Sequence, residues 1–180
     1  MTASFSNHRV ITDFVTGKSV LDIGPEANRQ AVEKYLVNEK GYARSDIIVD
    51  MAISLEISGK PYRTKLDLAV FVDNMFLMVI KCAAGSLDSR EREVVYAARV
   101  AAEKPVPVAV ASDGQTALVF DAIARKRIGE GLEAIPSPER GRRIIAETKA
   151  VSMPPQRREK EKIIFRSYDI MNVNTAENGC

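Results

Sequence analysis

The sequence has little of what several classes of protein require. It contains no tryptophan, one histidine (His8) and two cysteines, Cys82 and Cys180. Two cysteines do not form the disulfide framework of a small secreted domain, and a single histidine near the N-terminus is a poor basis for histidine catalysis. No run of about 18 apolar residues is present, so no membrane-spanning helix is predicted. The N-terminus lacks the basic and apolar regions of a secretory signal, and we therefore expect a cytoplasmic protein.

Other absences bear on organisation and activity. The chain has no phosphate-binding glycine loop, which excludes a nucleotide-driven motor activity within it. It has no internal repeat, no low-complexity segment and no Pro/Gly/Ser linker, and its 180 residues suit one domain with a sizeable core. We predict a loosely organised lead-in over residues 1–24, a single domain over 25–171 and a tail over 172–180.

The net charge of +2 conceals an uneven distribution. Residues 122–166 carry 12 Lys and Arg against 6 Asp and Glu, whereas residues 1–121 carry 14 against 16. Basic clusters can meet the phosphates of a nucleic acid, but charges of both signs also form ordinary solvated helix surfaces. The candidate nucleic-acid-binding residues are Arg125, Lys126, Arg127, Arg140, Arg142 and Arg143.

Hydrophobic periodicity predicts an α/β fold. Gly24-Pro25 and Gly41 bound an expected N-terminal helix. From residue 47 to residue 57 every odd position is apolar, which is typical of a strand with one covered face. Apolar runs over 66–72 and 75–82 predict two central strands, followed by strands at VPVAVAS and TALVFD. The order predicts a mixed central sheet flanked by helices.

Helices are expected after the third and fifth strands. Asp88 with Glu91 three residues later has the pattern of a capping box, and predicts a helix to about Glu103. Ser137-Pro138 favours a short helix over 138–149, and a last helix is expected over 157–171.

One residue interrupts the third strand. Lys81 follows an apolar run, and a lone lysine in a strand covered on both faces is costly unless it is paired or used. Because side chains alternate along strands, Lys81 and Asp67 of the neighbouring strand are expected to face one cleft. We therefore predict an Asp67–Lys81 ion pair.

Three ordered segments carry a family resemblance: RQAVEKYLVNEKGY, KLDLAVFVDNMFLMVIKCA and KPVPVAVASDGQTALVFDAIARKRIG. Over roughly residues 26–170 the chain resembles the N-terminal domain of type I restriction enzyme R subunits, part of the PD-(D/E)xK nuclease superfamily. The resemblance implies a restriction-endonuclease-like fold. It also implies a metal site made of an acid on the second strand and a carboxylate-x-lysine triplet on the third, where the metal activates water against a phosphodiester.

The resemblance assigns roles to individual positions, and the chain departs from the family at two of them. Asp67 matches the acid of the second strand, but Lys81 stands in place of the family's glutamate and Ala83 in place of its lysine. Asp67 and Lys81 are thus predicted to be a vestigial catalytic pair. Glu33 matches an acid often found near the metal, so Asp67 and Glu33 are the expected metal ligands only if the chain is active.

The supporting helix of the family is also altered. Tyr96 matches its tyrosine, whereas Arg92 stands in place of the glutamine four residues earlier. A tyrosine among valines and alanines is also commonly a packing residue.

Three functions stay open. The preferred one is a catalytically inactive domain without a cofactor that binds DNA or other restriction-modification subunits. The second is an active Mg²⁺-dependent endonuclease with a rearranged site, in which Asp50, Glu56 or Glu33 supplies the missing carboxylate and Lys65 or Lys81 the cation. The third is a homo-oligomeric protein without nucleic-acid function.

Overall fold

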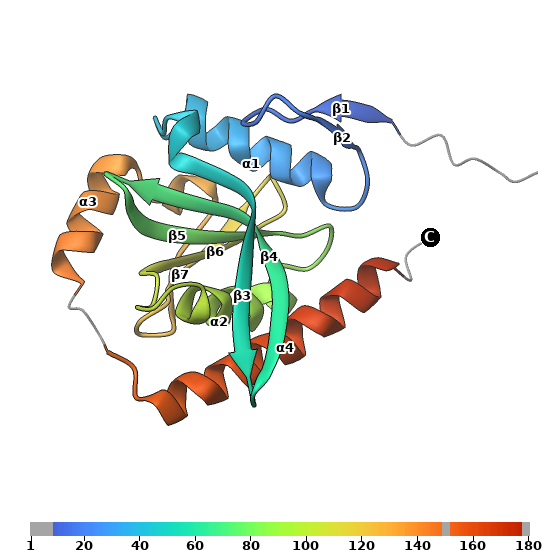
Figure 1. The fold of residues 1–180 in the computed structure, drawn as a ribbon. Coiled ribbons are helices and arrows are strands. Elements are labelled where there is room, and N and C mark those ends of the chain that lie inside the picture. Colours follow the sequence, from blue (N-terminus) through green and yellow to red (C-terminus); the bar gives the residue numbers. More distant parts are fainter. Residues whose placement is uncertain (1–8, 149–151, 178–180) are drawn as a thin grey trace, which may run out of the picture.

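The computed structural model describes residues 9–148 and 152–177, with the side chains of the last helix described to Met171. Six strands form one sheet in the order β3-β4-β5-β6-β7-β8, and two form a small separate sheet (Figure 1). The strands are β1 Val10–Thr12, β2 Ser19–Leu21, β3 Ile47–Ile57, β4 Lys60–Val72, β5 Met75–Cys82, β6 Val108–Ser112, β7 Ala117–Asp121 and β8 Lys126–Glu130. The helices are α1 Glu26–Asn38, α2 Glu91–Val100, α3 Pro138–Glu147 and α4 Pro155–Glu177, with short 3₁₀ turns at Arg44–Asp46, Asp88–Arg90 and Leu132–Ala134.

The large sheet is mixed, as the sequence predicts. Its neighbouring strands are antiparallel except β5 and β6, which run parallel and are connected through α2. The hairpins on either side of β4 turn at Ser58-Gly59 and Asp73-Asn74, where all four residues have positive φ. Two consecutive left-handed residues match the right-handed twist of the flanking strands, which is why such pairs favour tight hairpins.

Helices cover both faces of the sheet. The first core lies against α1 and α3 and includes Val32, Leu36 and Leu77. The second core lies against α2 and α4 and includes Val94 and Phe165. In Figure 1 the sheet separates α1 from the pair α2 and α4. No helix in the described ranges is both long enough and apolar enough to cross a membrane.

The hairpin of β3 and β4 contributes to both cores. Ile47 and Val49 pack in the first core, whereas Met51 and Ile53 pack in the second. The change falls at Asp50, whose φ of +51° departs from extended backbone. At this point the apolar side chains of β3 change from one face of the sheet to the other, although their period of two continues in the sequence. Asp67 of β4 lies opposite this position.

The predicted elements largely agree with the observed ones. β3 and β5 have the expected ends, and β4 begins earlier, at Lys60. The prediction of a capping box at Asp88 is wrong, because residues 88–90 form a 3₁₀ turn and no side chain caps α2. α3 matches its prediction to Glu147, and residue 149 lies outside the described residues. α4 continues past residue 171 to Glu177.

The sequence pattern missed three strands. β8 has the sequence KRIGE and is mostly exposed, so it lacks the apolar alternation that reveals a strand. β1 and β2 lie in the segment expected to be loosely organised, and each has three residues with little burial. Their hairpin is held by the buried carboxylate of Asp13 together with Val15, which packs against the first core, and polar burial has no periodic signature. His8 and Cys180 lie outside the described residues.

Candidate functional site

Asp67 and Lys81 meet across the middle of the sheet. The pairing of Leu68 with Ile80 places Asp67 directly opposite Lys81 on the adjacent strand. Lys81 Nζ lies 3.6 Å from Asp67 Oδ1, and the backbone N–H of Cys82 donates to Asp67 Oδ2 at 2.6 Å. The predicted ion pair is thus confirmed. Ala83, which the resemblance predicts to stand in place of the family's lysine, is buried.

A second carboxylate shares the Lys81 ammonium. Glu93 of α2 is 1% exposed, and its Oε1 lies 3.2 Å from Lys81 Nζ. Arg90 Nη1 lies 3.2 Å from Glu93 Oε2. Sequence reasoning missed Glu93, although a signal was present: it falls on the same helical stripe as the buried residues Ala97 and Val100. We call Asp67, Lys81, Glu93 and Arg90 the lysine cluster.

Burial and charge oppose each other in the lysine cluster. Burial raises the pKa of Asp67 and of Glu93, while the Lys81 ammonium acts to lower both. For Lys81, burial alone would lower the pKa, but Asp67 and Glu93 together raise it above its ordinary value. The lysine is therefore held as a cation between two carboxylates.

Asp67 also lines a small pocket on the α1 side of the sheet. The pocket has a volume of about 280 Å³, and its walls include Asp50, Lys65, Asp67 and Arg29. Lys65 Nζ lies 3.0 Å from Asp50 Oδ1, and both side chains are well exposed. The structure thus brings Asp50 and Lys65, two residues of the rearranged-site hypothesis, to the edge of the Asp67 site.

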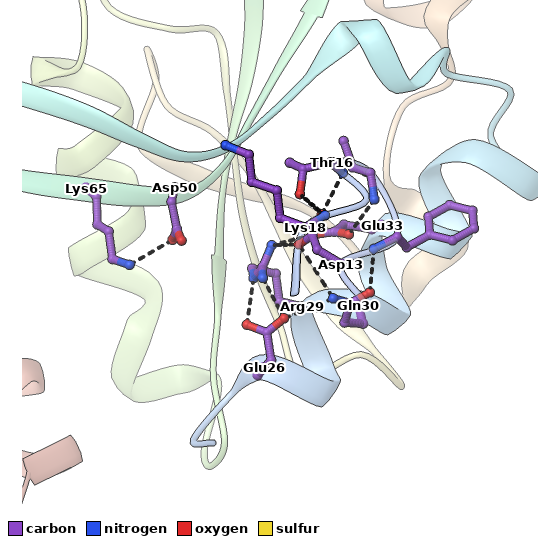
Figure 2. A network of polar contacts seen from close by, with 11 residues as sticks. Asp13, Thr16, Lys18, Glu26, Arg29, Gln30, Glu33, Asp50 and Lys65 are labelled. Atoms are coloured by element: carbon purple, nitrogen blue, oxygen red, sulfur yellow. Dashed lines mark hydrogen bonds and ion pairs between the residues drawn. The ribbon is translucent and has the colours of Figure 1, made fainter. Parts of the chain in front are cut away.

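Glu33 lies in a different polar network, between α1 and the β1–β2 hairpin (Figure 2). Arg29 Nη1 lies 2.5 Å from Glu33 Oε1 and 2.8 Å from Asp13 Oδ2, and Arg29 Nη2 lies 2.5 Å from Glu26 Oε1. Gln30 accepts from the N–H of Phe14 at 2.8 Å. We call Asp13, Glu26, Arg29 and Glu33 the arginine cluster. Figure 2 shows the exposed Asp50–Lys65 pair apart from it.

The arginine cluster holds three carboxylates around one guanidinium. Burial raises the pKa of Glu33 to about 7, with a further contribution from the Asp13 charge, although Arg29 acts to lower it. The Glu33 side chain is fully buried and does not line the Asp67 pocket. Its observed contacts attach the hairpin to α1.

Glu56, the other acid of the rearranged-site hypothesis, lies at the far end of β3. It is exposed and pairs with Pro61 next to the hairpin turn, and its carbonyl accepts from Lys162 Nζ at 2.8 Å. Glu56 lies near the end of β3 that is remote from Asp50, so the fold does not bring it to Asp67.

The candidate basic residues fall on two surfaces. Arg125, Lys126 and Arg127 follow β7, whereas Arg140, Arg142 and Arg143 lie on α3. Arg127 is within 4 Å of the carboxylates of Asp88, Glu91 and Glu130, and Arg142 pairs with Asp73 at 2.9 Å. Among the described residues no carboxylate forms an ion pair with the other four: Arg125, Lys126, Arg140 and Arg143.

Two further arginines have structural contacts. Arg158 donates to the carbonyls of Val100, Ala102 and Glu103, which lie at the C-terminal end of α2. Arg157 pairs with Glu161. A cation that satisfies the last carbonyls of a helix stabilises the helix end, so much of the positive charge on α4 has an internal role.

The lysine cluster does not fit the metal that the resemblance implies. A divalent cation at Asp67 would lie beside the Lys81 ammonium, which repels it, and one Asp67 oxygen already accepts from Cys82. In the part of the chain that the structure describes, no group of three or more His, Cys, Asp or Glu side chains is arranged to hold a metal ion. Metal-assisted hydrolysis needs paired carboxylates, whereas Asp67 pairs with the Lys81 ammonium.

Comparison with known proteins identifies the family. No curated protein and no solved structure matches the chain. A family model, described as type I restriction enzyme R protein N terminus, matches residues 24–136. The matched range begins just before α1 and runs past β8, so it contains the whole large sheet together with Asp67, Lys81 and Glu93. The chain therefore belongs to the family of type I restriction enzyme R protein N-terminal domains.

Proposed function

We propose that this protein is a DNA-binding member of its family that does not cleave DNA. The observation that carries the proposal is the Lys81 ammonium, which lies between Asp67 and Glu93 at the centre of the site. In a PD-(D/E)xK nuclease, to which superfamily we assign the domain, this space belongs to a divalent metal. Here Lys81, together with Arg90 on Glu93, neutralises the two carboxylates instead, and we propose that the chain needs no cofactor.

The chemistry of hydrolysis supports this proposal. Cleavage of a phosphodiester needs an activated water and a positive charge on the developing phosphorane, both of which a metal supplies. Lys81 could supply positive charge, but it cannot activate water while it is protonated, and its neighbours hold its pKa above the ordinary value. Asp67 has one oxygen in a hydrogen bond and the other beside Lys81. No free general base is left in the pair.

Binding to DNA is supported by the distribution of charge. Arg125, Lys126, Arg140 and Arg143 are exposed and make no ion pair within the described residues. Unpaired exposed cations release counterions when they contact phosphates, which favours association with nucleic acid. The family adds other restriction-modification subunits as a second class of partner. Such a protein would act in the cytoplasm.

The decisive experiment restores the missing groups. Wild type, Asp67→Ala and the double variant Lys81→Glu/Ala83→Lys would be incubated with Mg²⁺ and with single- or double-stranded DNA. We expect cleavage only by the double variant, because it regains both a carboxylate pair and a lysine. Cleavage by wild type that disappears in Asp67→Ala would overturn the proposal.

An active nuclease with a rearranged site is the second candidate. It is favoured by the pocket that gathers Asp50, Lys65 and Asp67, since Asp50 and Asp67 lie on adjacent strands and a cation is close by. Mg²⁺ would then be the cofactor. This candidate predicts that Asp50→Ala abolishes a Mg²⁺-dependent cleavage by wild type, whereas Glu56→Ala, at the other end of β3, leaves it unchanged.

A further inference from the structure

A groove separate from the Asp67 site lies where α2, α4 and the β7–β8 connection meet. Figure 1 shows α2 and α4 side by side on the same face of the sheet. The groove is open, has a volume of about 660 Å³, and is larger than the pocket at Asp67. Its walls are Glu91, Arg92, Val95, Tyr96, Ala124, Arg125, Lys126, Ile164 and Tyr168.

The charge in this groove is mainly positive. Arg92, Arg125 and Lys126 are exposed, and no carboxylate pairs with them among the described residues. Glu91, the one acid in the wall, lies 3.6 Å from Arg127 Nη2 and is partly neutralised by it. The groove therefore presents three cations against one shared carboxylate.

Two tyrosines lie among these cations. Tyr96 and Tyr168 are half-buried and come from different helices, α2 and α4. Arg92 Nη1 donates to the Tyr168 hydroxyl at 3.2 Å, which connects the two helices across the groove. Val95 and Ile164 complete an apolar floor. Aromatic faces between cations are the arrangement that binds unpaired bases together with their backbone phosphates.

We propose that this groove binds single-stranded nucleic acid, with bases against Tyr96 and Tyr168 and phosphates against Arg92, Arg125 and Lys126. The inference rests on the proposed DNA-binding function and names the strand form and the surface. In a duplex the faces of the bases are stacked on one another, so the tyrosines would have nothing to contact. In a single strand each base offers a face, whatever its sequence.

The segment that carries two of the cations, Arg125 of the β7–β8 connection and Lys126 at the start of β8, is well defined. Ala124 N–H donates to Asp121 Oδ1 at 2.8 Å, and Arg125 takes a left-handed conformation with φ of +56°. β8 then pairs with β7 directly after the turn. Arg125 thus stands on a turn fixed at both ends and Lys126 on the first position of β8, rather than on a loose loop, which lowers the entropy lost on binding.

The test measures binding of a fluorescently labelled oligothymidine strand by anisotropy at several salt concentrations. Tyr96→Leu keeps the apolar volume but removes the ring, and we expect it to weaken binding about tenfold. Tyr96→Phe keeps the ring and should bind like wild type. Arg125→Gln/Lys126→Gln should reduce the slope of log affinity against log salt by about 1.4, for two lost phosphate contacts. Arg140→Gln/Arg143→Gln on α3 tests the other basic surface, and Lys18→Gln/Lys34→Gln, two exposed cations on the β1–β2 hairpin and α1, is the matched control.

Each outcome is informative. Loss of binding in the groove variants, with the Lys18→Gln/Lys34→Gln control unchanged, supports the inference. Loss in the α3 variant alone overturns the groove but leaves the proposed DNA-binding function standing. Absence of wild-type binding to both the single strand and its duplex overturns both. Equal weakening by Tyr96→Phe and Tyr96→Leu would show that no base stacks on the ring and would overturn the tyrosine contact.

Discussion

The arginine cluster and the lysine cluster solve the same electrostatic problem in different ways. In each, one cation serves several carboxylates that the fold removes from water. Arg29 contacts Asp13, Glu26 and Glu33 at 2.5–2.8 Å. Lys81 contacts Asp67 and Glu93 at 3.2–3.6 Å. A guanidinium offers a planar set of five donors, whereas an ammonium acts as a compact charge with three.

Their surroundings differ as well. Asp13 and Glu33 are fully buried, and Arg29 is 6% exposed. Lys81 and Asp67 keep about a fifth of their surface, and Asp67 opens onto a pocket. The carboxylates of both clusters also have other partners: Cys82 N–H and Arg90 in the lysine cluster, and Thr16 and Val15 N–H in the arginine cluster, so exposure is what distinguishes the two. We infer that the arginine cluster stabilises the fold, while the lysine cluster occupies a partly accessible position beside a pocket.

Removal of the shared cation should be most costly in the arginine cluster. Arg29→Met leaves Asp13 and Glu33 buried without their cation, and we expect the free energy of unfolding to fall by about 3–5 kcal/mol. Denaturant unfolding followed by circular dichroism measures the loss. Lys65→Met is the matched control, because the exposed Asp50–Lys65 pair should contribute less than about 1 kcal/mol. Similar losses in both variants would contradict the assigned role of the arginine cluster.

The arginine cluster should also make stability depend on pH. The pKa of Glu33 is raised by folding to about 7 from an ordinary value of 4.5, so the folded state binds its proton more tightly than the unfolded state. The stabilisation is full below the unfolded pKa and is lost as the pH rises through about 7. From pH 5 to pH 8 we expect the Glu33 contribution to the free energy of unfolding to fall by about 2 kcal/mol.

Glu33→Gln tests this dependence. It keeps the shape of the side chain and cannot ionise, so the variant should lose that part of the decrease in thermal stability between the two pH values. A wild type and a variant with parallel pH profiles would show that Glu33 does not titrate in this range.

The smallest effect is expected in the lysine cluster. Lys81→Met should lower the free energy of unfolding by about 1–2 kcal/mol, because Asp67 reaches solvent and Glu93 keeps Arg90 as a cation. A double-mutant cycle with Glu93→Gln measures the coupling between the two residues. A loss as large as that of Arg29→Met would show that the lysine cluster is equally structural, and an additive cycle would show that Lys81 and Glu93 are not coupled.

Much of this structure was accessible from sequence because apolar periodicity is local. The alternation over 47–57 and the apolar run over 75–82 define β3 and β5, and they place Asp67 beside Lys81 on neighbouring central strands. The ion pair follows from that adjacency. β8 and the β1–β2 hairpin were not accessible in this way, since one is an exposed edge strand and the other is attached through a buried salt bridge.

The sequence by itself thus determined the mixed sheet, the family and the Asp67–Lys81 ion pair. Only the tertiary structure decided the rest. It brought Glu93 of α2 to Lys81, enclosed Glu33 with Arg29 and Asp13, and separated the basic residues onto two surfaces. The physical reason is that the spacing of apolar residues along the chain determines which face of a helix or strand is buried. A charge, in contrast, is stabilised by whichever partner the folded chain brings near it. That partner can lie anywhere in the sequence.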